Sequence, residues 1–332
     1  MIQYHHNRNG GNMRNKIYFG SLFLILGIGL YFGIGNYFYD KAINAKTSKS
    51  FLSVSSKVKK ITTEHKKVEL ERKEQNHTFL LQAIPEETSI ISSDKHSLKL
   101  HAIRYKQESL SHKWAIVVHG YGGSSKDMTT WNRNFYTQGY NVLAPDLRGH
   151  GQSGGNYIGM GWDDRKDILG WINEIVSQDY QAEIVLFGIS MGGATVMNAS
   201  GEELPSQVKA IIEDCGFTST AEIFGYQLKK LYHLPSFPVM NAANTVTKIR
   251  AGFDIFKSSA LNQVRKNQTP MLFIHGKEDD FVPFEMLEPI YEAAAGPKSK
   301  VIVEGAGHGE SEKVDPVLYW QSIWKFVENF IK

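Results

Sequence analysis

Hydrophobic positions along this chain follow two patterns. Residues 17–39 (IYFGSLFLILGIGLYFGIGNYFY) form one uncharged run, whereas beyond residue 88 short apolar runs alternate with segments of helical periodicity. As a helix, the uncharged run would be about 34 Å long, which is enough to cross the hydrocarbon core of a bilayer. Aromatic residues stand at both of its ends, where the two membrane interfaces would lie. The pattern predicts a transmembrane anchor at 17–39.

A cleaved signal peptide is the alternative interpretation of this run. Its apolar region would usually be about 7–15 residues long and would end in an A-x-A site, to which KAINAK is a poor match. Basic residues flank the run on both sides, so their count does not decide the orientation: Arg8, Arg14 and Lys16 before it, and Lys41, Lys46 and Lys49 after it. The basic leader 1–16 is typical of a signal anchor. We therefore expect a single-pass protein of the cell membrane, with the bulk of the chain on the extracytoplasmic side.

Residues 40–87 are polar and rich in lysine, as in SKVKKITTEHKKVELERKEQNH. Glutamates offset many of these lysines, which favours a solvated stalk or helix. The alternative is a basic face that contacts the membrane surface.

The remaining residues, 88–332, alternate between short apolar runs and helical segments. Strands are predicted at 98–105, 114–118, 141–144, 184–187, 208–212, 271–274 and 300–303, and helices near 128–138, 162–176, 193–200, 284–294 and 316–331. Buried strands that alternate with helices form βαβ units. The fold class predicted is therefore α/β, with a mostly parallel sheet flanked by helices, and ligands bind such sheets at the carboxyl ends of the strands.

One connection, at about 218–268, is too long for a simple crossover and is rich in aromatic residues. A segment of this length is seldom structureless inside a compact domain, so it predicts a small helical lid. Its apolar face either lines an acyl pocket or packs on the sheet.

Composition excludes several classes of protein. The formal net charge is only +3 over 332 residues and its excess lies near the N-terminus, which is unlike the basic stripe of a nucleic-acid binder. Cys215 is the single cysteine, so neither an intrachain disulfide nor a thiolate metal cluster can form. Neither an H-E-x-x-H motif nor a Walker lysine is present. We expect no cofactor and no metal.

A candidate nucleophile stands at Ser190. The stretch GISMG, residues 188–192, follows the apolar run EIVLF and opens a helix of small residues. This is the strand–turn–helix context of the G-x-S-x-G nucleophile elbow, in which the flanking glycines avoid steric clashes. The helix N-terminus would also favour negative charge that develops at the serine.

A serine hydroxyl needs a base, and the base needs an acid to orient it. Asp279 and Asp280 follow the predicted strand that ends at Ile274, and His308 follows the last strand, in the chain order Ser, acid, His. We favour Asp279 because its spacing to the Val-Pro pair places it in the turn before the helix. Asp280 and Asp214, the latter at the end of another strand, remain alternatives.

The oxyanion hole is expected to use two backbone N–H groups. One belongs to Met191, directly after the serine, and the other to Tyr121, in the loop HGYGG after an earlier strand. His119 in that loop is interpreted as structural. The glycine-rich stretch DLRGHGQSGG, 146–155, lacks the pattern of a phosphate site and is interpreted as a loop that shapes the pocket.

Five motifs, HGYGG, DLRGHGQSGG, GISMGG, HGKEDDFVP and GAGHGES, occur in that order. Together they resemble the α/β-hydrolase superfamily over about residues 88–332, and specifically the membrane-anchored bacterial serine hydrolases of the serine aminopeptidase S33-like or "hydrolase 4" group. The resemblance implies hydrolysis of an acyl bond through an acyl-enzyme, with Ser190, Asp279 and His308 as the triad. A serine at position 190 argues against the dehalogenase and epoxide-hydrolase branches. A departure is Glu310, which puts a carboxylate near the histidine.

The expected activity is that of a carboxylesterase or lipase acting on a small-molecule acyl ester, held at the membrane by its N-terminal helix. A peptidase of the S33 type or an acyltransferase would use the same triad. A binding protein that keeps the fold without turnover is less favoured, because every part of the machinery is present.

Overall fold

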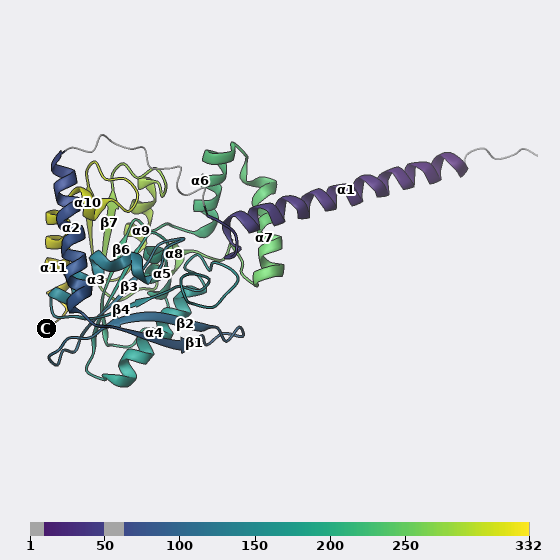
Figure 1. The fold of residues 1–332 in the computed structure, drawn as a ribbon. Helices are drawn as coiled ribbons and strands as arrows, with labels where there is room; N and C mark the ends of the chain where they lie inside the picture. Colours follow the sequence, from purple (N-terminus) through teal and green to yellow (C-terminus); the bar gives the residue numbers. More distant parts are fainter. Residues whose placement is uncertain (1–9, 50–62, 332) are drawn as a thin grey trace, which may run out of the picture.

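The computed structural model describes residues 10–49 and 63–331. Its eight strands form one sheet in the order β1-β2-β4-β3-β5-β6-β7-β8 (Figure 1). The strands are β1 Pro85–Ile91, β2 Lys99–Tyr105, β3 Lys113–Val118, β4 Asn141–Pro145, β5 Glu183–Ile189, β6 Val208–Asp214, β7 Met271–Gly276 and β8 Lys298–Val303. β1 and β2 are antiparallel to their neighbours, and all pairs from β4 to β8 are parallel. The predicted α/β class with a mostly parallel sheet is confirmed.

Helices cover both faces of the sheet. Successive residues of a strand point to opposite sides, so each inner strand contributes to two buried clusters. On β5, Val185 and Phe187 belong to one buried cluster, whereas Ile184 and Leu186 belong to the other. α2, α3 and α11 contribute to the first cluster, and α4, α5, α8 and α9 to the second. These helices span Thr63–Gln82 (α2), Thr129–Thr137 (α3), Asp164–Gln178 (α4), Met191–Ala199 (α5), Ala260–Val264 (α8), Leu287–Ala293 (α9) and Pro316–Val327 (α11), and α10 is a short turn at Ser311–Val314.

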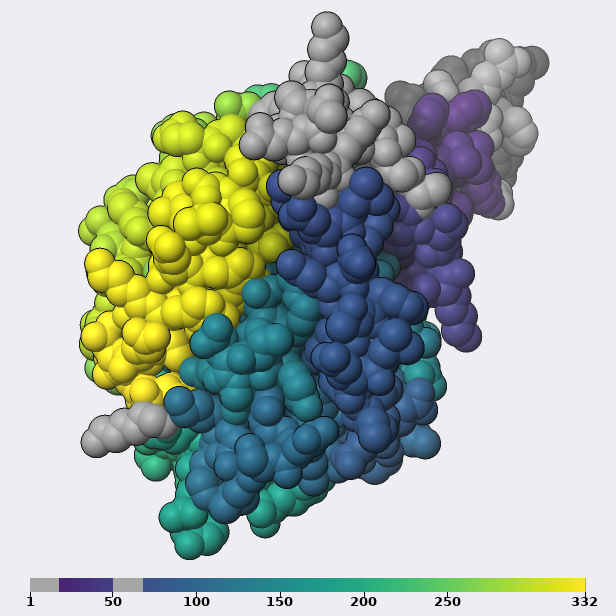
Figure 2. All heavy atoms as spheres, turned by 60° about the vertical axis from the view of Figure 1, so that its left-hand side comes forward, coloured from purple at the N-terminus to yellow at the C-terminus, as the bar shows by residue number. Residues whose placement is uncertain are grey.

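Two elements lie in the segment that the sequence presents as a polar stalk. β1 pairs with β2 at the edge of the sheet and most of its side chains are exposed, so its residues lack the apolar run that marks an inner strand. α2 crosses the surface beside the C-terminal helices (Figure 2). Arg72 of α2 forms an ion pair of 3.1 Å with Glu312, and Asn76 donates to the Thr130 hydroxyl at 2.9 Å.

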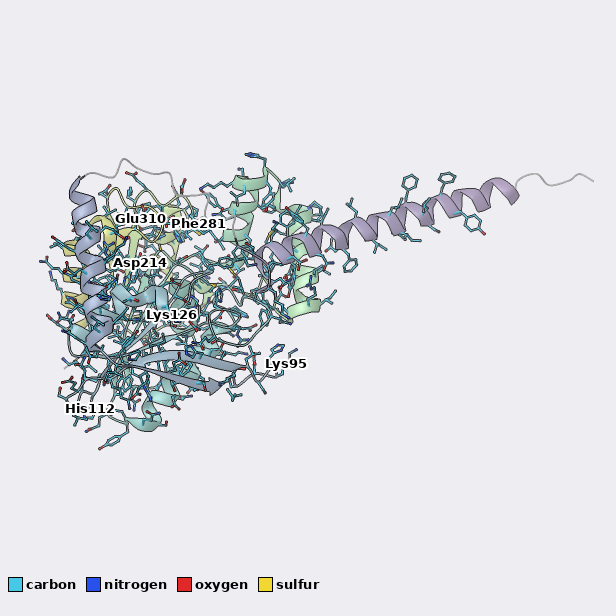
Figure 3. All side chains as sticks on the ribbon, in the orientation of Figure 1. Lys95, His112, Lys126, Asp214, Phe281 and Glu310 are labelled. Atoms are coloured by element: carbon cyan, nitrogen blue, oxygen red, sulfur yellow. The ribbon has the colours of Figure 1, made fainter. Side chains whose placement is uncertain are left out.

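The N-terminal helix α1, Gly10–Ala42, extends away from the sheet (Figure 1). Its side chains at positions 18–30 are exposed (Figure 3). Its stretch Tyr18–Ala42, with a mean hydropathy of 1.8, is long and apolar enough to cross a membrane. The inner end of α1 packs against α7, Ser236–Ala251, which follows α6, Thr220–Tyr232. α6, α7 and α8 make up the helical part of residues 218–268.

Candidate active site

Ser190 stands in a sharp turn between β5 and α5. Its backbone has φ of 57°, a left-handed conformation that costs a non-glycine residue on the order of 1–3 kcal/mol. A Cβ at Gly188 would collide with the Gly192 carbonyl, and a Cβ at Gly192 would collide with the Val118 carbonyl. The two glycines of GISMG are therefore required by the close approach of β3, β5 and α5, and the turn presents Ser190 at the start of α5.

A chain of two hydrogen bonds joins Ser190 to His308 and Asp279. His308 Nε2 lies 2.8 Å from Ser190 Oγ, and its Nδ1 lies 2.7 Å from Asp279 Oδ2. A carboxylate only accepts hydrogen bonds, so Nδ1 carries the proton and the Nε2 lone pair faces the serine hydroxyl. This is the tautomer that can remove the hydroxyl proton.

Asp279 is fixed by its own turn. Its Oδ1 accepts hydrogen bonds from the backbone N–H groups of Phe281 and Val282, each at 2.9 Å, which leaves Oδ2 for the histidine. Burial alone would raise the pKa of Asp279, but hydrogen bonds from His275 and His308 outweigh it and lower this pKa to about 2. The group is therefore an anion at neutral pH and can stabilise an imidazolium.

Of the three candidate acids, the structure brings Asp279 to the histidine. Asp280 is exposed and forms an ion pair of 3.2 Å with Lys230. Asp214 is buried one strand away, and its Oδ2 accepts a hydrogen bond of 2.8 Å from the Tyr319 hydroxyl.

The loop HGYGG lies against the serine. A Cβ at Gly120 would stand 3.3 Å from Ser190 Cβ. His119 is fully buried and bridges two loops: the Leu147 N–H donates to Nε2 at 3.0 Å, so Nδ1 carries the proton and donates to the Gly120 carbonyl at 2.7 Å. The structural interpretation of His119 is consistent with these contacts. Tyr121, which follows Gly120 in this loop, lines the same pocket as Ser190.

An apolar pocket opens above Ser190. The lid contributes side chains from both of its longer helices, among them Phe224 and Leu228 of α6 and Met240 of α7. Its apolar face therefore lines a pocket, and two of the same side chains, Leu228 and Met240, also belong to a buried cluster on the sheet. Sequence reasoning missed another part of the wall, which is formed by the last turn of α1 and the residue after it: Phe38, Tyr39, Lys41, Ala42 and Ile43.

Comparison with known proteins identifies the family. The family model described as "Serine aminopeptidase, S33" matches residues 111–251, which include the turn at Ser190. The uncharacterized protein YqkD of Bacillus subtilis (strain 168) is 32% identical over 219 residues, which are 64% of this chain and 70% of that protein. The chain belongs to the α/β-hydrolase superfamily.

Solved structures share the fold of this hydrolase. An esterase from Pyrococcus furiosus superposes with a TM-score of 0.61 and 20% identity, covering 76% of this chain and 93% of the esterase. An acylaminoacyl peptidase from Pyrococcus horikoshii gives a TM-score of 0.58 with 20% identity, over 77% of this chain and 44% of the peptidase. An esterase and a peptidase thus share this fold. The fold alone therefore does not show which bond is cleaved, and the residues of the site have to be considered.

Glu310, the departure in the motif GAGHGES, has a structural role in the hydrolase. Its Oε2 accepts a hydrogen bond of 3.1 Å from the Gly307 N–H, which closes the loop that carries His308. The Phe281 ring packs against the histidine ring, with ring centroids 4.9 Å apart. The two contacts hold the imidazole between Ser190 and Asp279.

Cys215, Asp279 and His308 of the hydrolase bring one possible metal-ligand atom each to within 4.8 Å of one another. A metal binds the thiolate form of cysteine. Burial raises the pKa of the Cys215 thiol well above its usual range, and the neighbouring carboxylates raise it further. This donor set therefore suits a neutral thiol beside a histidine–carboxylate pair better than it suits a metal.

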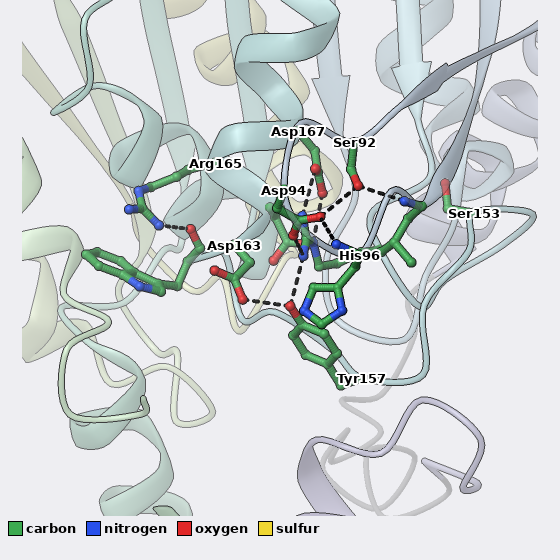
Figure 4. A network of polar contacts seen from close by, with 12 residues as sticks. Ser92, Asp94, His96, Ser153, Tyr157, Asp163, Arg165 and Asp167 are labelled. Atoms are coloured by element: carbon green, nitrogen blue, oxygen red, sulfur yellow. Dashed lines mark hydrogen bonds and ion pairs between the residues drawn. The ribbon is translucent and has the colours of Figure 1, made fainter. Parts of the chain in front are cut away.

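The loop DLRGHGQSGG is held by a buried network (Figure 4). The fully buried Arg148 binds Asp167 through two hydrogen bonds, of 2.9 and 2.8 Å, and also reaches Asp94 and the Tyr157 hydroxyl at 2.8 Å each. His150 of the same loop accepts the Gly122 N–H at 3.1 Å. The loop thereby fixes the HGYGG loop of the hydrolase from behind.

We expect His150 to make the hydrolase sensitive to acid. Burial, reinforced by the neighbouring His119, lowers the pKa of His150 to about 4, whereas an unfolded histidine titrates near 6.5. Between these values the unfolded chain takes up a proton that the folded chain does not, so stability falls by roughly 3 kcal/mol as the pH drops from 6.5 to 4. His150→Gln, which keeps an acceptor for Gly122, should lose less stability over this window in thermal unfolding scans. An equal loss in both chains would contradict the assignment.

Proposed function

We propose that this protein is a serine hydrolase that cleaves acyl esters through an acyl-enzyme. The observation that carries the proposal is the hydrogen-bond chain from Ser190 Oγ through His308 to Asp279. A hydroxyl is a weak nucleophile unless a base accepts its proton in the transition state. His308 has the position and the tautomer for this role.

In the proposed reaction, Ser190 Oγ attacks the ester carbonyl carbon while His308 Nε2 takes the hydroxyl proton. The N–H groups of Met191 and Tyr121 stabilise the oxyanion, a contribution of roughly 3 kcal/mol for each donor. The carbon–oxygen bond to the alcohol then breaks, and His308 returns the proton to the departing alkoxide. Water activated by the same nitrogen releases the acid, and Asp279 stabilises the imidazolium in both steps.

The pocket supports an ester in preference to a peptide with a free amino terminus. Of the pocket-lining residues in the described part of the chain, none is an aspartate or glutamate. An aminopeptidase needs an acidic group to bind the substrate ammonium, because a buried charge without a partner is costly. An apolar acyl chain matches the aliphatic and aromatic lining without this cost.

α1 supports a position at the cell membrane. We propose that it anchors the hydrolase as a single-pass signal anchor, with the folded domain on the extracytoplasmic side. The small-molecule ester and the membrane are then the partners of the protein, and nucleic acid is not one of them.

Labelling with a fluorophosphonate tests the proposal. The full chain in detergent should gain one covalent adduct, which peptide mass spectrometry should locate at Ser190. Ser190→Ala should gain none, while Ser124→Ala, a change in the neighbouring loop that removes a hydroxyl outside the hydrogen-bond chain, should label like the parent. A folded parent chain without an adduct would overturn the proposed function.

A further inference from the structure

The end of the membrane helix is part of the pocket wall. Phe38 and Ala42 of α1 line the same pocket as Ser190. The Phe38 ring meets the Tyr232 ring of the lid edge-to-face, with centroids 5.2 Å apart. The Ala42 carbonyl accepts a hydrogen bond of 2.7 Å from the hydroxyl of Tyr121, the residue expected to supply one oxyanion donor. The anchor thus reaches the reacting end of the pocket.

α1 is docked firmly on lid helix α7. A Cβ at Gly35 would collide with the Ala242 carbonyl of α7, so the two backbones touch at this point. The hydroxyls of Tyr31 and Thr245 are hydrogen bonded at 2.9 Å. Nearer the C-terminal ends of both helices, Arg250 of α7 forms an ion pair of 3.1 Å with Asp40. The contact therefore runs along α1 from Tyr31 to its C-terminal end.

The length of α1 places this contact at the membrane. The uncharged residues that precede Tyr31, 17–30, give a helix of about 21 Å, whereas the hydrocarbon core is about 30 Å thick. A spanning α1 must therefore use residues 31–39 to complete the crossing. Those residues lie against α7, so the lid has to sit at the membrane surface with its α1-facing side at the depth of the acyl chains.

The lid surface suits that position. Its exposed large apolar side chains are Leu231, Leu234, Phe237, Ile249 and Phe256. A group of exposed apolar residues on a water-facing protein surface marks an interaction site. Next to a membrane helix, the partner that fits such a group is the bilayer. Basic residues in the last turn of α7, Lys248 and Arg250, would then lie among the lipid headgroups.

We propose that α1 and the lid form a channel that admits a single-chain acyl ester directly from the bilayer, with its chain between α1 and α6 and its ester group at Ser190. The inference rests on the proposed function and specifies its substrate class as a membrane-dissolved, single-chain amphiphile. The chemical step is the ester hydrolysis described above. The anchor is then a substrate-binding element as well as a tether.

Ala42→Phe tests the wall directly, because it adds a ring to the pocket side of α1 near Ser190. We expect kcat/KM for p-nitrophenyl laurate to fall at least about tenfold, while that for p-nitrophenyl butyrate changes less than about threefold, since the loss of space for even one methylene lowers kcat/KM by about tenfold or more. Gly33→Phe is the matched control, because a side chain there meets open space and the residue lies outside the pocket. It should leave both esters unchanged. Equal effects of Ala42→Phe on both esters, or none on either, would overturn the proposal.

The source of the substrate is tested with the full chain in phosphatidylcholine vesicles that contain monolaurin. At a fixed total concentration of monolaurin, we expect the rate to follow its mole fraction in the bilayer. A rate that stays constant while the mole fraction is varied would show access from water and would overturn the membrane route. Failure of the proposed function is distinct, because then neither ester is hydrolysed and the fluorophosphonate leaves no adduct.

Discussion

Replacing Asp279 with asparagine is expected to lower kcat/KM for an acyl ester about 10⁴-fold, because the histidine would take the wrong tautomer. Oδ1 of Asp279 accepts two backbone N–H groups, so the asparagine carbonyl oxygen should take that place. The amide NH₂ would then face His308 Nδ1 and donate to it. The ring proton would move to Nε2, towards Ser190, where a lone pair is needed. Steady-state kinetics on p-nitrophenyl butyrate measures the loss.

Asp280→Asn is the matched control for this prediction. It removes the same charge one residue away, from a side chain that is exposed and paired with Lys230. We expect kcat/KM to stay within about twofold, as for other exposed charges. A loss in Asp214→Asn that matches or exceeds the loss in Asp279→Asn would assign the orienting acid to the strand end at Asp214 instead.

Local patterns were sufficient to predict the central sheet and the approach of Ser190, His308 and Asp279 to one another. Each inner strand is an apolar run because both faces of the sheet are covered, so periodicity marks it directly. GISMG is required by contacts between neighbouring elements, since Gly192 has no room for a side chain beside Val118. The acid and the histidine follow strands that end at one edge of the sheet, and this edge is where the structure brings Ser190, Asp279 and His308 together.

Features that depend on long-range contacts could not be predicted from the sequence. α2 and β1 are polar, and they become part of the domain through pairs such as Arg72 with Glu312, which no periodicity shows. The sequence favours Asp279 by its spacing, but it does not show that the rival Asp214 is bound by Tyr319, a residue of α11. The pocket wall formed by Phe38 and its neighbours is equally hidden, because an apolar membrane helix carries the same pattern whether or not it touches the domain.

Arg148 shows how much a loop can depend on a buried charge that the sequence does not mark. Burial would lower the pKa of its guanidinium, but Asp167 raises that pKa and keeps the group charged. The charged form of Asp167 is disfavoured by burial, which raises its pKa to about 6 even though the guanidinium is in contact with it. Two buried partners of this kind depend on each other, since either alone would be an uncompensated charge.

Arg148→Met is therefore expected to destabilise the protein by about 3 to 5 kcal/mol, because it leaves the carboxylate of Asp167 buried without its partner. Thermal unfolding of the full chain in detergent should show the melting temperature lowered by roughly 10 °C. Arg104→Met is the matched control: it breaks a pair with the half-exposed Glu86 at the sheet edge and should cost less than about 1 kcal/mol.

The double variant Arg148→Met/Asp167→Leu separates the ion pair from the packing around it. If the cost of Arg148→Met comes from the stranded carboxylate, removing that carboxylate should recover a substantial part of the lost stability. Additive losses in the double variant would instead mean that the arginine acts through its contacts with Asp94 and Tyr157. In either case ester hydrolysis at low temperature should persist in Arg148→Met, because none of these side chains lines the pocket at Ser190.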